Sequence, residues 1–243
     1  MRALRATVLG GCCALLGGCG PYIDEVVKER GPRVEQKISA VKAVGDELSK
    51  TPLLDKDEPA NLKASFQMTS GTPAPANAAL VYAEDLRELD ELGLVYARVS
   101  GTQLVNTCAA FVHTERHPWD PLHPEAAPSS GTGYTATKHF DLCEKLDFLL
   151  VLRTRGFVKP SVGRAGSSRQ EFDGGWIDAD LLVFDLASKK KVGGVRVQAE
   201  SSEQLEGASA FEVEFDLQWN LQKAVVAALK QHLPNVEVKG GPS

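Results

Sequence analysis

The sequence predicts an α+β fold, a two-layer domain in which a small, mainly antiparallel sheet is covered by helices. Three observations lead to this prediction. Residues 176–186 and 192–200 alternate apolar and polar side chains around a lysine-rich turn, which is the pattern of a β-hairpin. Residues 147–155 begin with a strongly apolar run that is typical of a buried strand. Residues 211–233 begin with strand-like alternation and then repeat apolar side chains at helical spacing, so a long helix should cover the sheet.

The first residues of the chain have the composition of an export signal. Arg2 and Arg5 form a basic start, and residues 6–18 are uncharged and rich in small and apolar side chains. A helix needs about 20 apolar residues to cross a bilayer, so this stretch is too short for a permanent span. These features together predict a signal peptide over residues 1–18.

The end of the signal resembles the lipobox of bacterial lipoproteins. Leu16, Gly17, Gly18 and Cys19 give an aliphatic residue, two small residues and a cysteine in the lipobox order. The resemblance implies cleavage before Cys19, diacylation of its sulfur with fatty acids such as palmitate, and usually acylation of the new amino group. In Gram-negative lipoproteins an aspartate after the cysteine favours the inner membrane. By that similarity Gly20 favours the outer membrane, with the protein facing the periplasm.

Acyl chains on Cys19 would make the lipid bilayer one partner of the protein. Each buried CH₂ group contributes about 0.8 kcal/mol, one myristoyl chain holds only marginally, and two chains anchor stably. An ordinary signal peptide or an uncleaved anchor would explain the arginines and the apolar run. Neither alternative explains the cysteine at the cleavage site.

The charge of the chain argues against a nucleic-acid partner. The full chain has 27 basic and 32 acidic residues, and loss of Arg2 and Arg5 with the signal leaves 25 against 32, a net charge of −7. Such a chain lacks the excess of lysine and arginine that neutralises phosphates. It also gains no attraction to anionic lipid, so the acyl chains must provide the anchor.

Two cysteines remain once the signal and the lipidation site are assigned. They are Cys108 and Cys143. In an exported protein such a pair is expected to form a disulfide. The bond would close a loop of about 36 residues and contribute roughly 3–4 kcal/mol in the chain-entropy description. Two separate buried thiols are the alternative.

Residues 19–76 are expected to form the lipidated N-terminus, a tether, a helix and a proline-rich linker. The tether ends at a Gly-Pro pair, and a helix is predicted over residues 33–50. Pro52 suits the end of that helix. The helix is predicted from an apolar stripe that consists of Val34, Ile38, Val41 and Leu48.

The compact domain is expected over residues 77–239. Asn77 can cap a helix over residues 78–92, a strand is predicted at residues 94–99, and residues 138–146 should form a short helix. The order of a strand, a hairpin containing LLVFDLASKKKVGGVRV and a long final helix is similar to periplasmic lipoprotein domains that assist envelope assembly or export. This resemblance is topological. It implies an envelope protein or polymer as partner and transfers no active residue.

The hairpin and the last helix each have a predicted apolar face. Alternation places one set of hairpin side chains on one face of the sheet: Ile177, Ala179, Leu181, Val183, Val195, Val197 and Ala199. Asp178 and Asp180 alternate with this set and are expected on the solvent face. The predicted apolar stripe of the last helix consists of Phe215, Trp219, Val226, Leu229 and Leu233.

Residues 113–137 are rich in Pro, Ser, Gly and Thr and are predicted to form a long loop, held by the expected disulfide. Trp119 and Tyr134 are the candidate contact residues of this binding loop, because aromatic side chains often anchor interfaces. Pinning of the loop to the domain by the same two side chains is the alternative. Residues 163–176 form a second candidate binding loop.

The same loop contains the candidate metal ligands His113, His117 and His123. The first two are four residues apart, as zinc ligands on a helix are. Nearby prolines argue against a helix, and neither HExxH nor paired CxxC occurs. A surface loop without metal is therefore favoured, and no cofactor is expected. A metal-binding protein or a metal-dependent enzyme that uses these histidines is the alternative.

The chain carries no motif of a known catalytic site. It lacks the GxSxG turn of a nucleophilic serine, and GTGYTATK lacks the Gly-Lys-Ser/Thr ending of a phosphate loop. The aspartates near residue 178 lack the calcium-loop pattern. The sequence thus predicts a non-enzymatic, membrane-anchored envelope lipoprotein that binds a protein or an envelope polymer.

Overall fold

The computed structural model describes residues 23–60, 63–67, 76–87, 137, 140–162, 172–202, 210–233 and 235–239. Its elements are α1 (Ile23–Lys50), β1 (Ala64–Gln67), β2 (Ala78–Tyr82), α2 (Ala83–Arg87), β3 (Phe148–Val158), β4 (Ser161–Val162), β5 (Phe172–Asp173), β6 (Trp176–Asp185), β7 (Lys190–Glu200), α5 (Ala210–His232) and β8 (Val236–Lys239). Among the helices described here, none is both long and apolar enough to cross a membrane.

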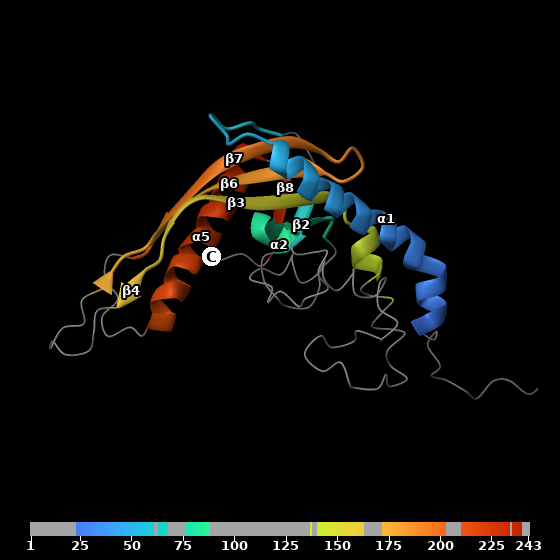
Figure 1. Ribbon diagram of the computed structural model, residues 1–243, viewed down its shortest axis with the longest axis horizontal. Coiled ribbons are helices and arrows are strands. Elements are labelled where there is room, and N and C mark those ends of the chain that lie inside the picture. Colours follow the sequence, from blue (N-terminus) through green and yellow to red (C-terminus); the bar gives the residue numbers. More distant parts are fainter. Residues whose placement is uncertain are drawn as a thin grey trace, which may run out of the picture.

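A six-stranded sheet in the order β7-β6-β3-β2-β1-β8 forms the centre of the molecule (Figure 1). The long strands β3, β6 and β7 pair antiparallel, whereas the short strands β2, β1 and β8 add parallel pairs beyond β3. By length the sheet is therefore mainly antiparallel. β4 and β5 form a separate two-stranded antiparallel sheet.

Helices cover both faces of the sheet, and alternate residues of β6 show this division. Leu182 and Phe184 belong to a buried cluster with α1 and α2, whereas Leu181 and Val183 belong to a second cluster with α5. Strands buried on both faces explain why the apolar runs of the sequence are so continuous. The predicted α+β class is confirmed, and α1 adds a layer to the two that we expected.

α1 is longer than predicted and belongs to the domain. The Gly-Pro pair does not break it, because Pro32 lies inside the helix, exposed to solvent, while Val26 and Val34 on either side are buried. The four residues of the predicted stripe are all buried in the cluster with β2, β3 and β6. β1 also joins the sheet. Packing therefore extends well before residue 77, where we expected the domain to start.

Residues 78–82 form β2 rather than the first part of a helix. Their run AALVY is apolar throughout, as suits a strand between two others with helices on both faces. Asn77 caps no helix. Its Oδ1 accepts a hydrogen bond from the Ser65 backbone N–H at 2.8 Å, and its Nδ2 donates to Asp147 Oδ2 at 3.3 Å. The helix begins only at Ala83, as α2.

The predicted hairpin is confirmed as β6 and β7. Its predicted apolar face is the one that packs in the cluster with α5. In the turn, Lys189 has a φ of 59°, and Asp185 Oδ1 accepts a hydrogen bond from the Ser188 backbone N–H at 2.6 Å. Residues 140–144 are helical, as predicted. The strand predicted at residues 94–99 lies outside the described residues.

α5 is helical from Ala210, whereas we expected a strand-like start. Its buried face in the first half is formed by Val213, Leu217 and Leu221, which repeat every four residues. Phe215 and Trp219 lie off this line, with exposed fractions of 54% and 37%, so their predicted place in the stripe is wrong. The later stripe residues are buried as predicted. β8 was not predicted.

Candidate functional site

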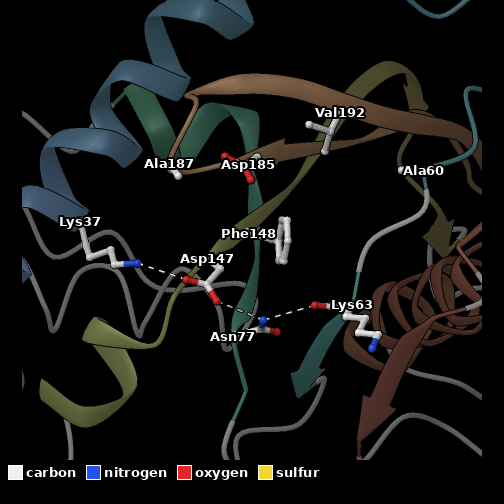
Figure 2. Close-up of a pocket in the computed structure, with 9 residues that line it drawn as sticks. All are labelled: Lys37, Ala60, Lys63, Asn77, Asp147, Phe148, Asp185, Ala187 and Val192. Carbon is white, nitrogen blue, oxygen red and sulfur yellow. Dashed lines mark hydrogen bonds and ion pairs between the residues drawn. The ribbon is translucent and has the colours of Figure 1, made fainter.

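A pocket of about 630 Å³ opens at the end of the sheet where β3 begins and β6 ends (Figure 2). Its walls come from parts of the chain that lie far apart in the sequence and that only the fold brings together. The lining residues are Lys37, Ala60, Lys63, Asn77, Asp147, Phe148, Asp185, Ala187 and Val192.

Asp147 is the centre of the polar wall of this pocket. Lys37 Nζ donates to Leu146 O at 2.6 Å and lies 3.3 Å from Asp147 Oδ1. Asn77 Nδ2 donates to Asp147 Oδ2 at 3.3 Å and to Lys63 O at 3.4 Å. Figure 2 shows this chain of contacts from α1 across the start of β2 and β3. Both oxygens of Asp147 are thus already engaged as acceptors.

Other groups of the pocket remain available to a ligand. The Lys63 ammonium makes no hydrogen bond or ion pair with any described residue. Asp185 uses one carboxylate oxygen for the turn, and Phe148 and Val192 supply apolar surface. No serine, cysteine or histidine is among the described residues that line the pocket. This arrangement can bind a group that has both polar and apolar parts.

A buried charge cluster lies on the face of the sheet that α1 also covers. Asp180 is fully buried, so the expectation that it faces solvent is wrong. Its carboxylate accepts hydrogen bonds from Arg153 Nη2 at 2.8 Å, from Arg155 Nη1 at 3.0 Å and from the Leu54 backbone N–H at 3.3 Å. The reason for the burial is that residues 51–60, which follow α1, cover this part of β6.

The same arginines hold the covering segment in place. Arg153 donates to Thr51 O and to Pro52 O, both at 2.6 Å, and Arg155 donates to Leu54 O at 2.8 Å. Arg153 Nε is a buried polar atom without a hydrogen-bond partner among the described residues. The cluster therefore acts mainly as a clamp between residues 51–60 and the sheet.

Asp178 continues the cluster toward solvent and is only partly exposed. Arg196 donates to both of its carboxylate oxygens, from Nε at 2.8 Å and from Nη2 at 2.6 Å. These hydrogen bonds lower the pKa of Asp178 despite the opposing effect of burial. The Arg196 backbone N–H donates to Asp57 Oδ1 at 3.0 Å, which ties the covering segment to β7.

Most of the site residues predicted from sequence lie outside the described residues. Cys143 is described: it is buried in the helical segment 140–144 and is disulfide-bonded. Its partner is not among the described residues, so the pairing with Cys108 stays a prediction. Within the described part of the chain, no group of three or more His, Cys, Asp or Glu side chains could hold a metal ion. The predicted residues that lie outside are Cys19, Cys108, His113, His117, His123, Trp119 and Tyr134.

The segment that carries Cys143 is joined to α1 by Arg30. Its Nε and Nη2 donate to the two carboxylate oxygens of Glu144 at 3.0 and 2.8 Å, and Nη2 also donates to Asp141 Oδ1 at 2.7 Å. The guanidinium lies 5.9 Å from the centre of the Phe140 ring, within cation–π range. The hydrogen bonds from Arg30 lower the pKa of Glu144 and raise the pKa of Arg30 itself.

Sequence reasoning missed both the pocket and the charge cluster. Of the residues that line the pocket, only Asn77 was singled out, and then as a helix cap. The parts that form each site are far apart in the chain, so local spacing does not reveal how they come together. Comparison with protein-family models, with curated proteins and with solved structures gives no match.

Proposed function

We propose that the protein is a lipoprotein of the bacterial cell envelope, anchored through acylated Cys19, that acts as a non-enzymatic binding or assembly module for an envelope protein or polymer. The lipobox that ends at Cys19 is the observation that carries the proposal. The position of α1 supports it, because this helix begins at Ile23, four residues after the predicted acylation site. Gly20 favours the outer membrane and a domain that faces the periplasm.

The pocket at the end of the sheet supports a binding role. Its central carboxylate is occupied by Lys37 and Asn77, whereas the Lys63 ammonium and the Phe148 side chain remain accessible to a ligand. The binding loop with Trp119 and Tyr134 is the other proposed contact surface. In this proposal the acyl anchor holds the protein at the membrane, and the pocket and the binding loop contact the partner.

The lipid anchor is tested by Cys19→Ser. We expect the variant to keep residues 1–18 and to take up no fatty-acid label, because the acyl acceptor and the cleavage signal are lost together. Mass spectrometry of the N-terminal peptide and labelling with a palmitate analogue measure both effects. Cys13→Ser is the matched control and should be processed normally, since Cys13 leaves with the signal. Identical processing of Cys19→Ser and the natural chain would refute the anchor.

The binding role is tested by photo-crosslinking in intact cells. A photoreactive residue is placed at Trp119 in the binding loop, at Lys63 in the pocket and at Lys56, an exposed position that serves as control. We expect a defined protein or polymer adduct from Trp119 or Lys63 and none from Lys56. The same adducts from all three positions would argue against a specific contact surface.

A further inference from the structure

Exposed apolar side chains gather at one end of the molecule, where β3 ends, β6 begins and α5 begins. Seven large apolar side chains are exposed in the described part of the chain, and five of them belong to this end. We call these five the apolar tip: Phe157, Val158, Trp176, Phe215 and Trp219. Their exposed fractions run from 37% to 54%. The other two, Leu53 and Val192, belong to different parts of the fold.

Backbone pairing and one side-chain hydrogen bond bring the strand residues and the helix residues of the apolar tip to the same end of the molecule. Val158 pairs with Trp176 across the β3–β6 ladder, and Trp176 pairs with Glu200 across the β6–β7 ladder. Asn220 Nδ2 donates to Glu200 O at 2.9 Å, which places the first half of α5 beside the end of β7. Phe215 stacks on Trp219, with ring centroids 6.4 Å apart.

The aromatic side chains of the tip are held in place rather than loose. A Cβ at Gly156 would come within 2.8 Å of the Trp176 ring, so the indole lies directly over this glycine. Lys223 Nζ lies 5.8 Å from the centre of the Trp219 ring. An indole beside a lysine is a pairing that suits the boundary between acyl chains and headgroups, where both residue types are found. Clustered exposed apolar groups on a protein mark a contact with a membrane or another protein.

The position of the acylation site favours the membrane. Figure 1 shows the sheet as an arch, with α1 descending on one side to its N-terminal end and α5 descending on the other side to its own N-terminal end, beside β4. Cys19 precedes Ile23 by four residues, which span at most about 14 Å when extended. A bilayer that holds the acyl chains of Cys19 must therefore lie close to the N-terminal end of α1, at the edge of the arch where the tip also lies.

We propose that the apolar tip is a second contact with the bilayer that holds the acyl chains of Cys19, so that the protein lies against the membrane at two points. The inference rests on the proposed lipid anchor. The five exposed side chains of the tip are apolar, so this second contact is an apolar one and does not depend on attraction of the acidic chain to anionic lipid. The tip contact can be weak by itself. The acyl anchor already holds the protein at the bilayer, which raises the effective concentration of the tip at the lipid surface.

Two contacts with the membrane define an orientation of the protein that a single contact cannot. α1 has 28 residues and is about 42 Å long at 1.5 Å per residue. Its far end, and residues 51–60 that follow it, would then point away from the bilayer. That orientation leaves the covering segment and its exposed Leu53 in the aqueous phase.

The test uses the processed, acylated full chain in vesicles of phosphatidylethanolamine and phosphatidylglycerol. A fraction of the lipid carries brominated acyl chains, which quench tryptophan fluorescence on contact. Trp119→Phe removes the third tryptophan, so that the fluorescence comes from Trp176 and Trp219 alone. We expect brominated lipid to remove most of their fluorescence. Trp176→Phe and Trp219→Phe, made singly in this background, assign the loss to each position.

A matched control places the reporter at the opposite end of the molecule. Leu53→Trp, in a chain whose three natural tryptophans are replaced by Phe, should be quenched by iodide in the water and not by brominated lipid. Iodide quenching of Trp176 and Trp219 without lipid quenching would overturn the proposal. Protection from both quenchers would also overturn it, since a protein partner or a second copy would then cover the tip.

The proposed anchor and the tip contact can fail separately. Mass spectrometry of the same sample shows whether Cys19 is acylated. Absence of acyl chains rejects both proposals. If Cys19 is acylated but brominated lipid does not quench the tryptophans, the tip contact is rejected and the lipid anchor is retained.

Discussion

Asp180 lies on the face that alternation predicts, yet its surroundings are the opposite of the prediction. The pattern of β6 separates Asp178 and Asp180 from the apolar residues that face α5, as the structure confirms. Alternation cannot reveal what lies over the polar face, because residues 51–60 are far away in sequence. Arg153 and Arg155, on the neighbouring strand β3, satisfy the buried carboxylate. Their alternate spacing was the one available signal for a charged partner on β6.

Removal of the Asp180 carboxylate should therefore be costly. We expect Asp180→Ala to lower the free energy of unfolding by about 3–5 kcal/mol, because Arg153 and Arg155 would stay buried without their counter-charge. Urea unfolding followed by circular dichroism measures the change. Asp178→Ala is the control. It should lose less free energy of unfolding, because its partner Arg196 is half exposed and water can solvate the arginine. Equal losses in the two variants would contradict the clamp.

At the scale of elements, long periodic segments were predicted well and short strands were not. The apolar stripe of α1, the hairpin and the buried strand β3 each repeat a pattern over many residues, so local sequence defines them. β1 has four residues and exists because it lies between β2 and β8. The run that forms β2 also fits a helix, and only its pairing with β3 decides the outcome. Such pairings depend on residues that are distant in the chain.

The contact between α1 and residues 140–144 should respond to acid. Hydrogen bonds from Arg30 hold the pKa of Glu144 below its ordinary value of 4.5, and those from Arg196 hold the pKa of Asp178 below 3.8. As pH falls, the unfolded chain binds these protons first. The two carboxylates therefore stabilise the folded state fully above pH 4.5. This stabilisation is lost as the pH falls through their lowered folded-state pKa values. We expect the thermal unfolding midpoint to drop in that range.

Arg30→Ala provides the comparison for this acid response. Glu144 would lose its main hydrogen-bond donor, so its pKa should return toward the ordinary value and the variant should lose less stability below pH 4.5 than the natural chain. Above that pH the variant should be the less stable of the two. Arg33→Ala removes an ion pair whose arginine is largely exposed, so its acid response should stay close to that of the natural chain. Parallel curves for Arg30→Ala and the natural chain would refute the assignment.

At the scale of the whole molecule, the class of fold could be predicted and the extent of the domain could not. A linker and a helix that packs on the core can share the same local composition. What distinguishes α1 is that Val34, Val41 and Val44 are fully buried against the sheet. The pocket illustrates the same limit, because Lys37 reaches it from α1 while Asp147 and Asp185 reach it from the sheet.

A chain that begins at residue 77 should therefore fail to fold. It lacks α1 and β1, so one face of the sheet would lose the cover of α1 and β8 would lose its neighbour in the described sheet. We expect residues 77–243 to show no cooperative thermal transition. Residues 20–243 are the control and should unfold cooperatively at the midpoint of the mature protein. A cooperative transition in the shorter chain would show that α1 is dispensable.

The pairing of β8 with β1 also sets the order in which the molecule can be completed. A ribosome delivers the chain N-terminus first, and β1 ends at residue 67, whereas its outer partner begins at residue 236. The outer edge of β1 therefore stays unpaired until residues 236–239 have been delivered. Such long-range closure slows folding, because distant chain segments must meet. Any product that stops before residue 236 leaves this strand edge unpaired, and an unpaired edge can pair with other chains and aggregate.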